Sequence, residues 1–248
     1  MGEYKQTPSD WRPRRTTQDD LTPAQRKAEG LIFSLLGVVL SEVPFLGAAY
    51  NELRSYRSEQ FMESRLSHMH HQLISRMEGV EEEAVNREYL VSEALFDLIS
   101  KAVETALRTR DREKVGYIAS ILKGAVLNPN QENHLAEDLA EEYMYLVSDL
   151  TPQELRVART LYNLQKGQEN TDLTQRMESW KLHRDSLGSE HSLSSNDLSL
   201  TLNRLASTGA VDRVLPMVPG ETLEPIYRVS APFDRLMRFL ESETSDPT

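Results

Sequence analysis

A histidine pair, an acidic run and a basic run are the groups in this sequence whose residue types and spacing could do chemistry. His68 and His71 stand one helical turn apart, which suits two ligands of a metal ion. Neither a third carboxylate ligand nor the HExxH spacing of metal-dependent hydrolases accompanies them. Histidines exposed on an amphipathic helix are therefore the favoured interpretation, and we predict no metal site.

The acidic run lies in one short segment of the chain. Carboxylates at i and i+4 can act as a general acid and base or hold Mg²⁺, but only where other polar groups converge on them in a cleft. Nothing else in the sequence points to such a cleft, so we interpret the run as the solvated face of a helix. Its members are Glu137, Asp138, Glu141 and Glu142.

Other catalytic signatures are missing from the sequence. It has no glycine-rich phosphate loop and no serine nucleophile elbow, and the absence of cysteine excludes a thiol nucleophile, a thiolate metal site and a disulfide scaffold. We therefore expect a protein that is not an enzyme and needs no cofactor. A chain without cysteine also fits a reducing cytoplasm, which is the predicted location.

The basic run is the densest cluster of positive charge in a chain whose net charge is -11. It could bind a phosphate or an acidic partner at a helix N-terminus. The favoured interpretation is a helix junction that neutralises nearby acid, because residues 30–150 carry eleven Lys and Arg against twenty Asp and Glu. The run comprises Arg108, Arg110, Arg112 and Lys114.

The first fifty residues divide into a polar arm and an apolar stretch. Residues 1–21 have little apolar content and are expected to form a disordered arm. A capping box at Thr22 begins a helix, and Glu42 is the only charge in residues 30–50, a stretch close to the roughly 20 residues that span a bilayer. Because Pro44 interrupts the stretch, a helical hairpin buried in an all-α core is favoured over membrane contact. A hairpin buried at rest and released on activation is left open.

Apolar residues at helix-like spacing then predict four helices, over residues 51–79, 81–110, 112–127 and 131–148. The second and third of these helices should pack as an antiparallel pair, since each carries a broad apolar stripe. Together with the apolar hairpin they form the expected α-helical domain, residues 22–149.

A second domain is expected over residues 150–241, followed by a disordered tail at 242–248. Thr151, Pro152 and Glu154 form a second capping box, which restarts the chain as a helix. The elements expected in this domain are helices over residues 152–164, 173–187 and 194–207, strands over 211–215 and 226–229, and a closing helix over 233–240.

Three helices, a two-stranded hairpin and a final helix in this order resemble the winged helix-turn-helix domain of bacterial regulators, over residues 151–241. The expected fold class is therefore mainly α, an N-terminal α-helical bundle followed by a C-terminal winged helix-turn-helix with a small β-hairpin. The resemblance implies a DNA-binding module whose third helix enters the major groove. The residues expected to contact DNA are Ser195, Asn196, Ser199, Asn203 and Arg204 on that helix, with Arg213 and Arg228 on the strands.

The sequence departs from a strong DNA reader in its charge. The expected recognition face is polar but nearly uncharged, and the hairpin tip at 217–224 carries two glutamates and no Lys or Arg. Phosphate contacts usually supply much of the affinity of a DNA-binding protein. Upstream, residues 43–47 followed by a long helical region are similar to uncharacterised bacterial helical proteins, a likeness that carries no motif of known chemistry.

Two classes of function are left open. The first is a bacterial regulator that binds double-stranded DNA through the winged helix and senses an effector or forms a homo-oligomer through its helical domain. The second is a protein-interaction or defence-type factor that docks a protein partner on the winged helix and engages a partner or a membrane through residues 30–50. We favour the regulator.

Overall fold

The computed structural model describes residues 56–167, 173–215 and 224–245. In this part of the chain the fold is mainly helical, with a two-stranded antiparallel sheet near the C-terminus. The sequence-based prediction of a mainly α protein with a small β-hairpin is therefore confirmed at this level.

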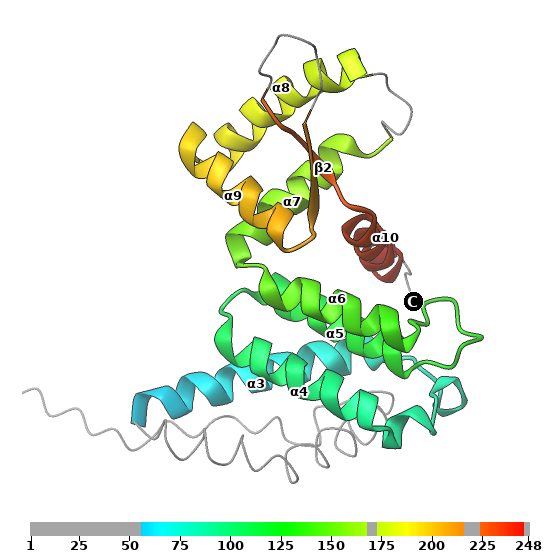
Figure 1. The fold of residues 1–248 in the computed structure, drawn as a ribbon. Helices are drawn as coiled ribbons and strands as arrows, with labels where there is room; N and C mark the ends of the chain where they lie inside the picture. Colours follow the sequence, from blue (N-terminus) through cyan, green and yellow to red (C-terminus); the bar gives the residue numbers. More distant parts are fainter. Residues whose placement is uncertain (1–55, 168–172, 216–223, 246–248) are drawn as a thin grey trace, which may run out of the picture.

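Helices account for most of the described elements. In chain order the elements are α3 (Tyr56–Met77), the short 3-10 helices η2 (Glu82–Ala84) and η3 (Tyr89–Val91), α4 (Glu93–Arg108), α5 (Arg112–Val126), α6 (Glu137–Asp149), α7 (Pro152–Gln165), α8 (Leu173–Glu190), α9 (Ser195–Ser207), β1 (Val211–Val214), β2 (Ile226–Val229) and α10 (Ala231–Ser245). Helices α3 to α6 form a layer at one end of the molecule, α7 to α9 and the sheet form the other end, and α10 lies between them (Figure 1).

Several predictions fall on residues outside the described part of the chain. They are the disordered arm at 1–21, the helix that begins at Thr22, the apolar hairpin at 30–50, nearly all of the hairpin tip at 217–224 and the last three residues of the disordered tail at 242–248. Among the residues that the structure does describe, no helix combines the length and the apolar character needed to cross a bilayer.

Helix α5 is the centre of the helical layer and is buried along most of its length. It packs against α3 and α6, and α4 lies beside it as the sequence predicts. Two glycines interrupt its apolar residues, and at Gly124 the side chains of Leu135 and Phe239 approach the helix backbone closely. A helix near the middle of the chain therefore supports both its neighbours in the layer and α10.

The helix predicted over residues 81–110 is shorter than expected. α4 begins only at Glu93, with Ser92 as its N-cap. Before it, Val85 forms an isolated antiparallel bridge with Leu127, at the end of α5. Backbone groups that hydrogen bond to this distant segment are not available to a helix, which is why the periodic apolar pattern overestimates its length.

The helix predicted over residues 131–148 also begins later, at Glu137. Leu135 is buried, and its N–H donates a hydrogen bond of 2.9 Å to Gly124 O. That carbonyl belongs to the last turn of α5, where backbone oxygens lack helical partners. The segment before α6 therefore completes the end of α5 instead of extending α6.

The capping box and the hairpin of the C-terminal region are confirmed. Thr151 Oγ1 accepts a hydrogen bond of 3.2 Å from Glu154 N, and Glu154 Oε2 accepts one of 2.8 Å from Thr151 N. After α9, Gly209 adopts a positive φ of 79°, a conformation that glycine reaches without strain. The chain then enters β1, which pairs antiparallel with β2 so that Val211 lies opposite Val229.

The closing helix extends beyond its predicted end. α10 runs from Ala231 to Ser245, so residues 242–245 of the expected disordered tail are helical. The reason is Glu243, whose carboxylate lies 3.0 Å from Lys123 Nζ and whose side chain is only 1% exposed. This ion pair fixes the last turns of α10 on α5.

The two glycines of α5 provide a matched test of this packing. A Cβ at Gly124 would lie 2.9 Å from both Leu135 Cγ and Phe239 Cζ, whereas at Gly116 the nearest atom is a guanidinium nitrogen of Arg76 at 3.4 Å. We expect Gly124→Ala to lower the free energy of unfolding by about 1–3 kcal/mol through overpacking. Gly116→Ala should raise it by up to about 1 kcal/mol, because alanine favours the helix. Urea titration followed by circular dichroism measures both, and effects of the same sign would contradict the description of this interface.

Candidate functional site

The histidine pair and the acidic run are not assembled into a catalytic arrangement. His68 Nε2 is buried without a hydrogen-bond partner among the described residues, and burial, followed by the positive charges of Arg112 and His71, lowers the pKa of His68. In the acidic run, Glu142 forms an ion pair of 3.3 Å with Arg235 of α10. Within the described ranges, no three His, Asp or Glu side chains are placed to hold a metal ion.

Lys114 of the basic run is buried where α5 meets the end of α6. Its ammonium donates hydrogen bonds to Ser148 O at 2.9 Å and to Leu150 O at 2.6 Å. These carbonyls end α6, where backbone oxygens lack helical partners. Burial lowers the pKa of Lys114, against the opposing effect of nearby carboxylates. Lys114 therefore joins two helices, and its ammonium lies against these carbonyls and not at the surface.

The three arginines of the basic run are exposed on and beside the connection between α4 and α5. Arg108 forms an ion pair of 2.8 Å with Glu104, one turn earlier on α4. Arg110 and Arg112 have no carboxylate partner among the described residues. The cations of Arg110 and Arg112 are therefore free of intramolecular charge pairing in this part of the chain.

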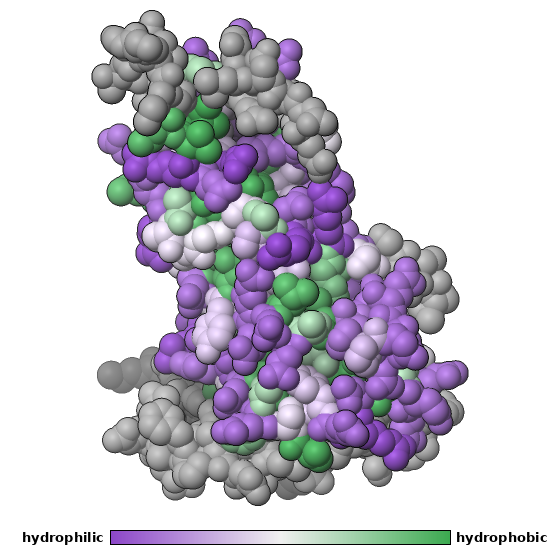
Figure 2. Space-filling model, turned by 45° about the vertical axis from the view of Figure 1, so that its right-hand side comes forward, coloured by the Kyte–Doolittle hydropathy of each residue, from purple (hydrophilic) through white to green (hydrophobic). Residues whose placement is uncertain are grey.

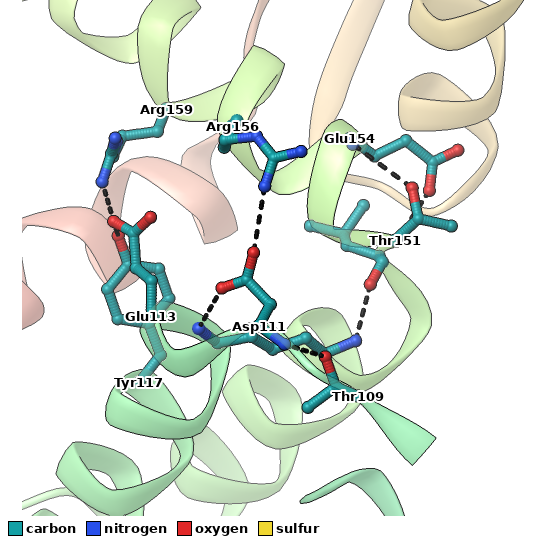
Figure 3. Close-up of polar contacts among 10 residues, drawn as sticks. Thr109, Asp111, Glu113, Tyr117, Thr151, Glu154, Arg156 and Arg159 are labelled. Atoms are coloured by element: carbon teal, nitrogen blue, oxygen red, sulfur yellow. Dashed lines mark hydrogen bonds and ion pairs between the residues drawn. The ribbon is translucent and has the colours of Figure 1, made fainter. Parts of the chain in front are cut away.

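Two ion pairs join the start of α5 to α7 beside this connection (Figure 3). Asp111 Oδ2 lies 3.0 Å from a guanidinium nitrogen of Arg156, while the same carboxylate caps the N-terminus of α5. Glu113 pairs with Arg159, one turn further along α7. Together with Lys114, these contacts fix the helical layer against α7.

Helix α9 buries one face and presents the other to solvent. Leu198, Leu202 and Leu205 are buried, as their spacing predicts. The exposed face carries hydroxyl and amide side chains, but it also carries Leu200, which is 65% exposed. The exposed residues of this helix, which include all five predicted contacts, are Ser195, Asn196, Asp197, Ser199, Leu200, Asn203, Arg204 and Ser207.

Two of the three predicted arginines pair with carboxylates of the chain itself. Arg204 Nε lies 2.6 Å from Glu154 Oε1, whose side chain is only 5% exposed. Arg228 Nε lies 3.2 Å from Asp212 Oδ2 on the neighbouring strand. Arg213 is exposed and has no carboxylate partner in the described part of the chain. Of the three, Arg213 can therefore contact an anion without first breaking an ion pair within the described part of the chain.

Tyr227 of β2 connects α9 to the rest of the C-terminal region. Its hydroxyl donates a hydrogen bond of 2.7 Å to Asn203 Oδ1, and its ring lies 5.5 Å from the ring of Trp180 on α8. Gln165 of α7 donates to Tyr227 O at 3.0 Å and accepts from Val229 N at 2.9 Å. Helices α7, α8 and α9 are thus held to one strand, and Asn203 has part of its hydrogen-bonding capacity occupied.

A cavity of about 660 Å³ lies among α7, α8, both strands and α10. Its size suits a small molecule, but its charged lining residues neutralise one another in opposite pairs. The sequence predicts no site here, because the lining comes from five elements and shares no local motif. On the face that Figure 2 shows, most of the described surface is hydrophilic, with hydrophobic residues between the hydrophilic ones. The pairs are Lys166 with Glu241 at 2.7 Å, Arg228 with Asp212 at 3.2 Å and Arg238 with Asp234 at 2.9 Å.

Comparison with family models, with curated proteins and with solved structures gave no match.

Replacement of Lys114 tests its role at the helix junction. Lys114→Met keeps the length of the side chain but leaves Ser148 O and Leu150 O without their donor, so we expect the free energy of unfolding to fall by about 1–3 kcal/mol. Arg112→Met, two residues earlier and exposed, is the control and should change it by less than about 0.5 kcal/mol. Urea unfolding measures both, and an equally small effect of the two variants would show that the buried ammonium contributes nothing.

The buried histidines predict a loss of stability in mild acid. Burial alone lowers the pKa of His183 from its ordinary value of 6.5, and it is the largest cause of the same shift at His68 and His191. As the pH falls through 6.5, the unfolded chain binds more protons than the folded chain. The free energy of unfolding therefore decreases, and it continues to decrease until the pH has passed the folded-state pKa values. We expect a decrease between about pH 7.5 and about pH 5.5, measured by urea unfolding. The variant His183→Gln should show a shallower pH dependence, and an unchanged slope would contradict the assignment.

Proposed function

We propose that residues 151–245 form a winged-helix module that binds double-stranded DNA through α9 and the sheet, and that the chain is a non-enzymatic transcriptional regulator. In this proposal the helical layer senses an effector or forms a homo-oligomer. The observation that carries the proposal is the exposed polar face of α9, which stands on a buried leucine face and beside an antiparallel hairpin. This arrangement of a solvent-facing helix and a wing is what a winged-helix reader needs.

The chemistry of the face supports direct reading of bases. Amide side chains form bidentate hydrogen bonds with adenine in the major groove, and serine hydroxyls bond to either partner of a base pair. Asn196 and Ser199 lie exposed in the first turns of α9, and the N-terminal residues of a recognition helix are those that contact base edges. Asn203 lies one turn beyond Ser199 and offers its amide nitrogen, because Tyr227 occupies its oxygen.

The electrostatics of the module favour specific over non-specific binding. Arg204 and Arg228 are paired internally, so a phosphate must compete with Glu154 or Asp212 for each of them. Arg213 contributes a cation without that competition. With few phosphate contacts on the module, discrimination between sequences depends mainly on the hydrogen bonds from the α9 face.

Selection from a pool of randomised duplexes tests the proposal with the full chain. We expect enrichment of one sequence, followed by a loss of about 1–3 kcal/mol of discrimination at single base pairs in Asn196→Ala and Ser199→Ala. Ser186→Ala, an exposed serine on α8, is the matched control and should bind like the wild type. Failure of the pool to converge would contradict the proposal. Arg204→Glu is a poor test, because it would place a second carboxylate against the buried Glu154 and disturb the fold.

A second candidate function is docking of a protein partner on the same face. The observation that favours it is the exposure of large apolar side chains, Leu200 on α9 at 65% and Leu182 on α8 at 70%. Such residues serve as anchors in protein interfaces and contribute little to contact with a phosphate backbone.

Leu200→Lys separates the two functions. A new cation on a DNA-reading face adds a phosphate contact and should tighten binding to any duplex. The same change on a protein-docking face removes an apolar anchor and should abolish recovery of the partner. Duplex binding by the full chain and its copurifying proteins are measured side by side. Ser75→Lys, at an exposed position of α3 in the helical layer, is the charge control.

A further inference from the structure

Three exposed arginines gather at the connection between α4 and α5, in a chain of net charge -11. Arg110 and Arg112 are exposed there without a carboxylate partner among the described residues. The neighbouring arginines are paired: Arg108 with Glu104, Arg156 with Asp111 and Arg159 with Glu113.

We propose that this connection, defined by Arg108, Arg110 and Arg112, is a second DNA contact that binds the phosphodiester backbone of the duplex read by α9. The inference rests on the proposed function, and it supplies the phosphate contacts that the winged-helix module lacks. Arginine suits this task because its planar guanidinium donates paired hydrogen bonds to phosphate oxygens.

The connection is held at a fixed position relative to α9. Asp111, between the two free arginines, pairs with Arg156 at 3.0 Å, which anchors the connection to the first turns of α7. Two residues before Arg156, Glu154 pairs with Arg204 of α9 at 2.6 Å. An unbroken series of contacts therefore runs from the connection through α7 to the reading helix.

The two surfaces lie on either side of the start of α7. In Figure 1, α9 lies above the start of α7 and the connection between α4 and α5 lies below it, both toward the left of the view. Figure 3 shows the start of α5 facing α7 across the ion pairs that join them. In the inference, one duplex extends from α9 past the start of α7 to the connection.

The salt dependence of DNA binding tests the inference with the full chain. The probes are two duplexes that carry the sequence enriched by the selection: one limited to the α9 site and one extended by about a helical turn on each side, about 10 base pairs. We expect the wild type to bind the extended duplex more tightly and with a steeper salt dependence. In Arg110→Ala/Arg112→Ala the slope of log K against log salt should be shallower by about 1.8, or about 0.9 per lost contact, on the extended duplex only.

Arg87→Ala/Arg235→Ala is the matched control, since it removes the same charge from exposed positions on the η2–η3 connection and on α10. It should retain the wild-type difference between the two duplexes. Arg110→Gln/Arg112→Gln, which keeps polar side chains of moderate length, guards against an effect of folding and should behave like the alanine pair. Circular dichroism of every variant verifies its helical content.

Two results would overturn the inference, and they are distinguishable. If the arginine pair and its control behave alike on the extended duplex, while Asn196→Ala still loses discrimination, the connection does not touch DNA and the proposed function stands. If the wild type enriches no duplex sequence, the proposed function fails and this inference fails with it.

Discussion

The ammonium of Lys114 is the contact on which the relation between the two ends of the molecule depends. It lies in the interior, where burying a charge costs free energy. The charge is tolerated because two carbonyls at the end of α6 accept hydrogen bonds from the ammonium. The same carbonyls would otherwise lack partners, so each group satisfies the other. With α6 and α5 fixed in this way, the ion pairs from Asp111 and Glu113 set the direction in which α7 leaves the helical layer.

Glu154 connects the first turn of α7 to α9. One carboxylate closes the capping box of α7 and holds Arg204, so the orientation of α9 follows from the first turn of α7. In the proposed function this arrangement separates two tasks, with uncharged side chains on α9 distinguishing base pairs and cations of the helical layer attracting the phosphate backbone. A reader of this kind has little affinity for DNA that only one of its two surfaces can reach.

The sequence predicted what local signals encode. The capping box at Thr151 and the leucine spacing of α9 depend on residues within a few positions of one another, and both predictions are confirmed. The predicted start of α4 was wrong because Val85 pairs with Leu127, more than forty residues later in the chain. For the same reason Lys114 looked equivalent to its neighbouring arginines, although burial separates it from them. The internal pairing of the predicted arginines likewise depends on tertiary contacts that no short motif records.

The ion pair of Lys123 with Glu243 has a consequence for the synthesis of the chain. The two residues are 120 positions apart, so α5 leaves the ribosome long before its partner on α10 has been translated. During that interval the contact of Phe239 with α5 at Gly124 is absent. The packing of α10 on α5 therefore forms only after α10 has been translated, and a nascent chain that ends within α9 lacks it.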